Sequence, residues 1–264
     1  MLPAATVWLL PVLLAFQTPV CGAPQEIGRT CALIVKGISK DPGDRAAKDR
    51  LVQELRRYLL NEAKVDRSRL VVLGSADAGA TAKAVTEAMN AFGASVGETD
   101  RFVLYYAGQA NAVAETLRFN LAGPDLTGDD VAQLLSHIRA RTHLIVLDCP
   151  HAALAGKAMA GKGRVLVCAS TETQAYSTRF GLHFVPALSR PESDTSGDGK
   201  VSVLEAFTTA AREIEQWYRD RAILPTETPC MEDNGDGQAS EQPWRHATDA
   251  TDGLAASQLV LAPN

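Results

Sequence analysis

Two strand-like segments of the sequence end in residues that can do chemistry. The run 101–110 starts at Arg101, continues with five hydrophobic and aromatic residues, and ends in a small-residue turn that carries Gln109. A second run, 143–148, is followed by Cys149 and, two positions later, by His151. A cysteine thiolate is a nucleophile and histidine is a general base near neutral pH, whereas glutamine can only hold a group in position. These two strand ends form the first candidate site.

The segment 194–205, D-T-S-G-D-G-K-V-S-V-L-E, is a candidate metal site. Its spacing matches the calcium loop of EF-hands, in which oxygen ligands at alternate positions wrap one hard cation. The predicted ligands are five side chains and the backbone carbonyl of Lys200: Asp194, Ser196, Asp198, Lys200, Ser202 and Glu205. We predict a structural Ca²⁺ of modest affinity that fixes the following helix. The alternative is a solvated acidic turn that caps this helix without metal.

Two features limit the match to EF-hand proteins. The residues before the loop, Ser189-Arg190-Pro191, do not end a regular helix, so a complete helix–loop–helix unit is not expected. A second acidic turn, 232–237, begins in a similar way but carries Pro243 at its twelfth position. Proline cannot supply the bidentate carboxylate of that position, and we interpret this segment as a turn.

Buried strands and helices alternate along the chain. The expected strands cover residues 31–38, 70–73, 102–106, 143–148 and 164–169, and the expected helices cover 44–63, 81–92, a segment opening at 127–130, and 201–222. This alternation predicts an α/β fold of three layers, with a mostly parallel central sheet and helices on both faces. Ligands of such sheets bind beyond the carboxyl ends of the strands. If the strands that begin near Phe102 and His143 are neighbours, about 4.8 Å apart, their ends lie side by side.

The segments Y-Y-A-G-Q-A, V-L-D-C-P-H-A-A and D-G-K-V-S-V-L-E-A-F resemble the caspase-like and legumain-like cysteine peptidases. The resemblance covers about residues 31–188 and is closest to bacterial relatives of the legumain type. In this family one strand ends in a turn that carries the catalytic histidine. The next strand ends in an acid, a small residue and the nucleophilic cysteine. The resemblance implies a caspase-like fold with its site at these two strand ends.

The chain departs from the family at the catalytic positions. Gln109 stands where the family has histidine, Pro150 stands at the nucleophile, and Cys149 lies one place early. Glutamine has no proton equilibrium near neutral pH, and proline has no backbone N–H to donate to an oxyanion. We therefore predict that peptidase activity is lost and that the domain is a binding or scaffold module for a protein or peptide partner. The alternative is an active cysteine endopeptidase that uses Cys149 with a nearby histidine such as His151.

The N-terminus carries the pattern of an export signal. Residues 1–22 contain no charged side chain, and the apolar run 4–16 is shorter than the roughly 20 residues that span a bilayer. We predict a secretory signal peptide cleaved after Gly22, and therefore an exported protein in the periplasm or outside the cell. Lipid attachment at Cys21 is the alternative.

The remaining predictions concern organisation and charge. We expect a caspase-like domain at 23–190, the calcium loop and its helix at 191–225, and a turn-rich tail at 226–264. The formal net charge of −5 argues against nucleic acid and against anionic membrane surfaces as partners. Export would leave four cysteines, Cys31, Cys149, Cys168 and Cys230, which permit two disulfides in an oxidising compartment without favouring any pairing.

Overall fold

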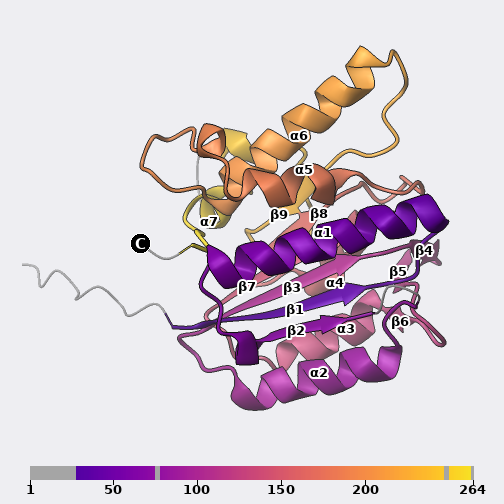
Figure 1. Cartoon of the computed structure of the whole chain (residues 1–264), viewed down its shortest axis with the longest axis vertical. Coiled ribbons are helices and arrows are strands. Elements are labelled where there is room, and N and C mark those ends of the chain that lie inside the picture. The colour runs from indigo at the N-terminus through magenta and orange to yellow at the C-terminus, as the bar shows by residue number, and fades with distance from the viewer. Residues whose placement is uncertain (1–27, 75–77, 247–249, 263–264) are drawn as a thin grey trace, which may run out of the picture.

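The computed structural model describes residues 28–74, 78–246 and 250–262, and the predicted signal peptide with Cys21 lies outside these ranges. Its centre is a six-stranded sheet in the order β2-β1-β3-β7-β8-β9, with β9 the antiparallel member (Figure 1). The strands are β1 (Thr30–Lys36), β2 (Leu70–Leu73), β3 (Arg101–Ala107), β7 (Thr142–Asp148), β8 (Arg164–Cys168) and β9 (Cys230–Glu232). The predicted mostly parallel α/β sheet is confirmed.

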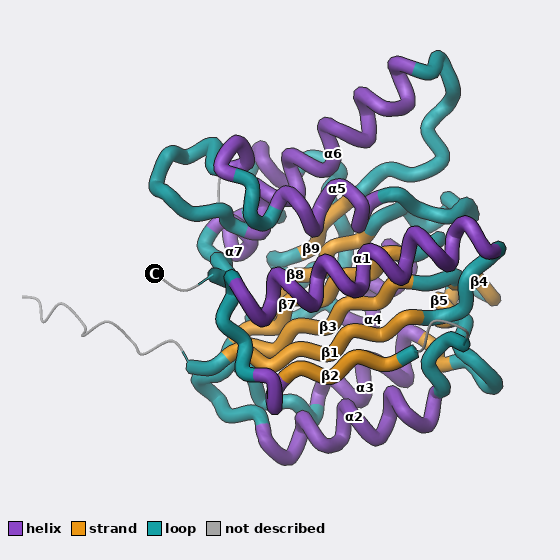
Figure 2. Tube along the Cα trace, in the orientation of Figure 1, coloured by secondary structure: helices purple, strands orange, loops and turns teal. Residues whose placement is uncertain are grey.

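Helices cover both faces of this sheet and complete three layers (Figure 2). One face packs against α1 (Pro42–Asn61), α5 (Phe180–Ala187), α6 (Val203–Asp220) and α7 (Leu254–Ser257). The other face packs against α2 (Ala82–Ser95), α3 (Gly128–Ser136) and α4 (Gly156–Met159). Within the described ranges, no helix combines the length and the hydropathy of a membrane span.

Strand β3 shows why the sheet is buried on both sides. Phe102, Leu104 and Tyr106 enter the core on the side of α2 and α3, whereas Val103 and Tyr105 enter the core on the side of α1 and α5. Successive side chains of a strand point to opposite faces, so an unbroken apolar run requires cover on both. The run predicted as the central strand is therefore confirmed.

Several boundaries differ from the expected ones for local reasons. The first strand ends at Lys36 because Ile38 leaves the sheet and its N–H donates to the carbonyl of Asn120. Helix α6 begins at Val203 because the side chain of Ser202 caps it, in a reciprocal capping box with Glu205.

The structure also contains elements that the sequence pattern did not predict. A small antiparallel sheet of β4 (Ala110–Val113), β5 (Thr116–Phe119) and β6 (Leu126–Thr127) follows the central strand. Strand β9 comes from the segment expected to be a turn-rich tail. Its outer side pairs with Ser240, through backbone hydrogen bonds of 2.9 and 2.7 Å between Met231 and Ser240. With only three residues, β9 is too short to show a period.

Candidate functional site

The two predicted strand ends lie side by side at the carboxyl edge of the sheet. Strands β3 and β7 are parallel neighbours, and their register places Ala107 opposite Asp148. The backbone N–H of Gly108 donates to the carbonyl of Asp148 over 3.3 Å. The predicted juxtaposition of the turn that carries Gln109 with the segment 148–151 is thus confirmed.

Gln109 is anchored on both sides of this edge. Its side-chain amide donates to Ser177 Oγ at 2.9 Å and to Asp44 Oδ2 at 3.3 Å. Its backbone N–H donates to the carbonyl of Ile38, and its own carbonyl accepts the hydroxyl of Tyr106 at 2.7 Å. Gln109 therefore connects α1 with the loop after β8, and its amide positions these groups without exchanging a proton.

Asp44 is part of an ion pair in the first turn of α1. Lys48 Nζ lies 2.6 Å from both carboxylate oxygens of Asp44, and both side chains are largely buried. Although burial acts to raise the pKa of Asp44, hydrogen bonds from Lys48 and from the backbone N–H of Lys40 hold that pKa below its ordinary value. A negative charge therefore persists beside the amide of Gln109.

Asp148 is an acid enclosed at the end of β7. It is only 4% exposed, and Thr178 Oγ1 donates to its Oδ1 at 2.6 Å. The hydroxyl of Tyr105 lies 3.4 Å from its other oxygen. Burial raises the pKa of Asp148 despite the hydrogen bond from Thr178 and the nearby charge of Lys48. This carboxyl group is held by the protein itself rather than presented to solvent.

Cys149 is enclosed in the core. Its side chain is 0% exposed and packs among hydrophobic residues on the side of α2, α3 and α4. Burial raises the pKa of the Cys149 thiol well above its usual value, and the charge of Asp148 adds to this effect. Ser170 fixes the backbone here, because its hydroxyl donates to the Cys149 carbonyl at 2.9 Å and accepts the Ala152 N–H at 3.1 Å. The thiol is therefore neutral and shielded near neutral pH.

His151 follows the bend at Pro150 and contacts the loop that carries Glu172 and Gln174. Its backbone has φ 56°, in the left-handed region, and its N–H donates to the carbonyl of Gln174. Ring atom Nδ1 lies 2.8 Å from the carbonyl oxygen of Glu172. In the described part of the chain, no hydrogen bond joins His151 to Cys149. The structure thus brings these two residues to one strand end without pairing their side chains.

The loop segment Ser177-Thr178-Arg179 completes the site, although none of its residues was among the predicted site residues. Ser177 accepts from Gln109, and Thr178 donates to Asp148. The guanidinium of Arg179 stacks 3.7 Å above the ring centroid of Trp217. This loop shows no periodicity, and the partners of each residue are far away in the sequence, so no local signal marks it.

Arg179 contacts a second buried acid, Glu227. Its backbone N–H donates to Glu227 Oε2 at 2.7 Å, and burial raises the pKa of Glu227 to about 7. The charge of Asp148 also acts to raise this pKa. Arg179 Nε is itself buried and has no hydrogen-bond partner in the described residues. The edge of the sheet therefore holds one donor that the protein leaves unpaired.

The predicted calcium loop folds around its first and last acids. The Asp194 carboxylate accepts the N–H groups of Gly197 and Gly199 at 2.7 and 2.8 Å, and both glycines have positive φ. Ser196 connects the two ends, because its hydroxyl donates to Asp194 at 3.2 Å and its N–H donates to Glu205 at 2.8 Å. Backbone hydrogen bonds lower the pKa of Asp194 against the opposing effect of burial. Within 28–74, 78–246 and 250–262, no three His, Cys, Asp or Glu side chains converge closely enough to hold a metal ion.

The second acidic turn serves the packing of the C-terminal segment. The Asp233 carboxylate accepts the N–H groups of Gly253 and Ala256 at 2.7 Å each, at the start of α7. Asp252 in turn accepts the N–H of Asp233 at 2.9 Å and that of Ser240 at 3.1 Å. These bonds agree with the interpretation of 232–237 as a structural turn.

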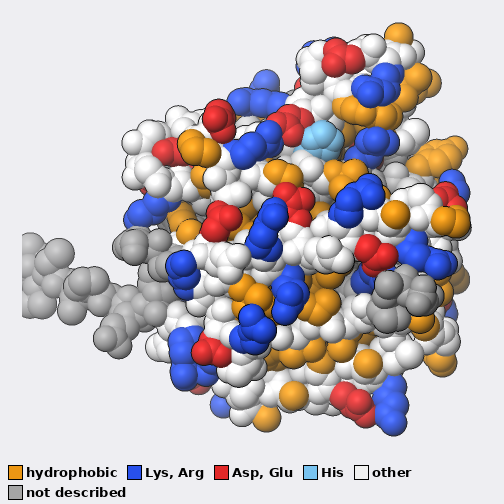
Figure 3. Space-filling view, viewed as in Figure 1, with side chains coloured by type: hydrophobic (Ala, Val, Ile, Leu, Met, Phe, Trp, Pro, Cys, Tyr) orange, Lys and Arg blue, Asp and Glu red, His pale blue; other side chains and the backbone are white. Residues whose placement is uncertain are grey.

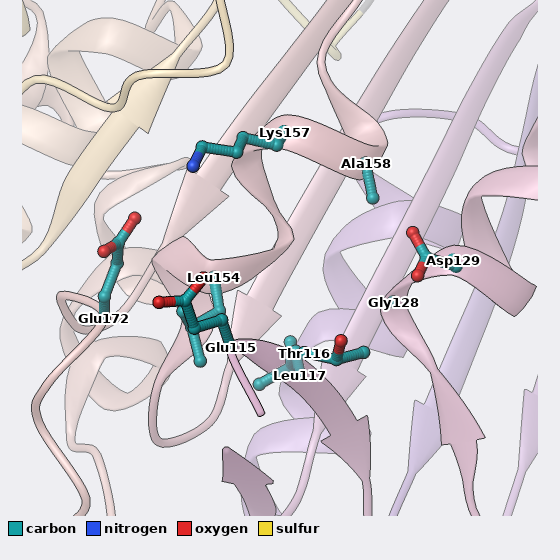
Figure 4. A pocket seen from close by; sticks show the side chains of 9 residues that line it. All are labelled: Glu115, Thr116, Leu117, Gly128, Asp129, Leu154, Lys157, Ala158 and Glu172. Carbon is teal, nitrogen blue, oxygen red and sulfur yellow. The ribbon is translucent and has the colours of Figure 1, made fainter. Parts of the chain in front are cut away.

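A cavity of about 340 Å³ lies on the α3 and α4 side of the same edge (Figure 4). Its lining combines polar and apolar side chains from five segments: Glu115, Thr116, Leu117, Gly128, Asp129, Leu154, Lys157, Ala158 and Glu172. Figure 4 shows Glu115 and Glu172 on one side of the cavity and Asp129 on the other. None of the site residues predicted from the sequence lines it.

Comparisons with known proteins identify the fold and leave the activity open. No family model matches the chain, and no curated protein matches it. The chain is similar to the crystal structure of protein GSU0716 from Geobacter sulfurreducens, with a TM-score of 0.51 and 15% sequence identity. The match covers 78% of this chain and 93% of that one. At this identity, the likeness extends to the fold alone.

Proposed function

We propose that this chain is a caspase-like or legumain-like domain that has lost peptidase chemistry and binds a protein or peptide partner. The observation that carries the proposal is the state of Cys149, whose thiol is 0% exposed and whose pKa is raised by burial. A cysteine peptidase needs an exposed thiolate and a base within hydrogen-bonding distance of it. Here the base position holds an amide that donates to Ser177 and Asp44.

The unpaired Arg179 donor at the carboxyl edge supports binding rather than catalysis. Arg179 offers a buried Nε–H with no partner among the described residues, on a guanidinium that Trp217 holds in place. Hydrophobic side chains are exposed shortly after Trp217 in the sequence, at Ile223 and, with 87% exposure, at Leu224. Figure 3 shows hydrophobic side chains gathered over the outer end of α6. A peptide that supplies a hydrogen-bond acceptor and an apolar side chain fits these groups.

The calcium loop is proposed as a structural element of this module. Ser196 contacts both Asp194 and Glu205, and this link between the third position of the loop and its first and twelfth positions supports the proposal. Asp198, Ser202 and the carbonyl of Lys200 would complete an oxygen shell for a hard cation. The bound ion would neutralise the acids and fix the start of α6. Export, with or without a lipid at Cys21, is proposed from residues 1–22, which lie outside the described ranges.

The test is the alkylation rate of each cysteine against pH, mapped by mass spectrometry. Cys149 is expected to react at least about 100-fold more slowly in the native protein than in denaturant, because the reagent reaches it only after local opening. In the fully reduced protein Cys168 is the matched control, since it is equally buried in a neighbouring strand. Rapid reaction of Cys149 alone at pH 5–6 would instead indicate a thiolate, and the endopeptidase alternative would replace the binding proposal.

A further inference from the structure

Cys168 and Cys230 face each other across the antiparallel edge of the sheet. Strands β8 and β9 are neighbours in the sheet (Figure 1). Their antiparallel register places Cys168 directly opposite Cys230. Both side chains enter the same hydrophobic core, on the side of α4, so they project from the same face of the sheet. The Cys230 thiol donates to the carbonyl of Ser170, two residues after Cys168, over 3.8 Å. Directly opposed residues of antiparallel strands have Cα atoms about 4.5–5.5 Å apart, within the roughly 4.4–6.8 Å that disulfides span.

The other described cysteines lie too far from Cys168 to form a disulfide with it. In the parallel register of β7 and β8, Leu147 lies opposite Cys168, and Cys149 lies two residues further along. One strand spacing across and two residues along separate the Cα atoms of Cys149 and Cys168 by about 8 Å, beyond the roughly 7 Å that a disulfide allows. Cys31 on β1 is separated from β8 by β3 and β7, or about 14 Å at the usual strand spacing.

We propose that Cys168 and Cys230 form a disulfide when the protein folds in an oxidising environment. With a disulfide oxidant such as glutathione disulfide, one thiolate displaces a glutathione and forms a mixed disulfide. The second thiolate then displaces the other glutathione and closes the protein disulfide. Two protein thiols are oxidised, and two glutathione thiols are produced. This bond goes beyond the proposed binding function and does not depend on it.

Burial decides when this bond can form and break. Cys168 is 0% exposed and Cys230 is 2% exposed, so neither an oxidant nor a reductant reaches them in the native protein. We therefore place the reaction before β9 docks on β8. Once formed, the bond closes a loop that contains the site segment 177–179, the calcium loop and α6. Closing so long a loop in the unfolded chain raises the melting temperature by roughly 5–15 °C.

The experiment is disulfide mapping of the full chain after oxidative refolding. The reduced, denatured protein is refolded with reduced and oxidised glutathione, free thiols are then alkylated in denaturant, and the unreduced chain is digested with trypsin. The four described cysteines fall in separate peptides: residues 30–36, 142–157, 165–179 and 222–245. The expected product joins 165–179 to 222–245 and is two hydrogen atoms lighter than their sum. Cys31 and Cys149 should be alkylated.

Two cysteine variants and a reduction test check the proposed disulfide. Cys230→Ser should leave Cys168 alkylated and remove the rise in melting temperature on oxidation. The matched control Cys31→Ser should retain the disulfide and the rise in melting temperature. Native oxidised wild type should keep the bond in a reductant until denaturant is added. Alkylation of both Cys168 and Cys230 in the refolded wild type, or linkage of Cys168 to Cys149, overturns the proposal even if a variant fails to fold.

Discussion

Substitution of Glu227 by glutamine tests the electrostatics of the site quantitatively. Glu227 is 2% exposed, and burial raises its pKa from 4.5 to about 7, with the charge of Asp148 contributing in the same direction. A carboxyl group whose pKa is higher in the folded state favours folding when it is protonated. Its ionisation therefore costs stability as the pH rises from about 4.5 to about 7. A shift of this size corresponds to about 3 kcal/mol of unfolding free energy above pH 7.

Glutamine keeps the shape of Glu227 and removes this charge. Its carbonyl oxygen can still accept the N–H of Arg179, which Glu227 Oε2 accepts at 2.7 Å. Glu227→Gln is therefore expected to be near neutral at pH 4.5 and to stabilise the protein by about 2–3 kcal/mol at pH 8. Urea denaturation of both proteins across this pH range measures the difference. Glu241→Gln, at an exposed position, is the matched control and should change stability by less than about 0.5 kcal/mol at either pH.

The way in which the stability change of Glu227→Gln varies with pH tests whether Glu227 has a raised pKa. If Glu227→Gln changes stability equally at pH 4.5 and pH 8, Glu227 does not titrate with a raised pKa and its burial has no electrostatic cost. A destabilisation that grows with pH would show that Glu227 is ionised and paired in the folded protein, most directly with Arg179. Either result would contradict a buried, neutral Glu227 in the folded protein near neutral pH.

Two further predictions concern the calcium loop and the backbone beside Cys149. Millimolar Ca²⁺ should raise the melting temperature of the mature protein, and Asp194→Ala should abolish this rise while Asp236→Ala, in the second turn, should preserve it; no shift in the wild type by calorimetry contradicts the metal site. Ser170→Ala removes the hydroxyl that serves both the Cys149 carbonyl and the Ala152 N–H, and should cost about 1–3 kcal/mol in denaturant unfolding. A cost below about 0.5 kcal/mol would mean that other groups satisfy this buried backbone.

The central sheet could be predicted from the sequence because its parallel strands are unbroken hydrophobic runs. The five parallel members read as apolar runs, and alternation with helices implies parallel pairing, so the meeting of Gln109 with Asp148 followed from topology alone. The expected start of the second helix near residue 81 also agrees with the structure, in which Thr81 caps α2. These features depend on residues close together in the sequence or on a general rule of α/β folds.

The features that escaped prediction depend on distant partners. Ser177, Thr178 and Arg179 become site residues only because Gln109, Asp148 and Trp217 are placed beside them by the fold. The raised pKa of Glu227 results from burial, and the segment around it has no periodic pattern that would reveal this. Strand β9 consists of three residues, and its assignment rests on pairing with β8. Tertiary contact alone defines these features.

The short strand β9 also affects how this protein can self-associate. An exposed sheet edge is a template on which a strand from another chain can pair. At this edge the backbone groups of Met231 are already engaged by Ser240, and β9 offers only three residues. Continuous addition of strands past β9 is therefore blocked by the chain itself. The opposite edge, β2, has four half-buried residues and is the side of the sheet from which edge-to-edge aggregation would begin.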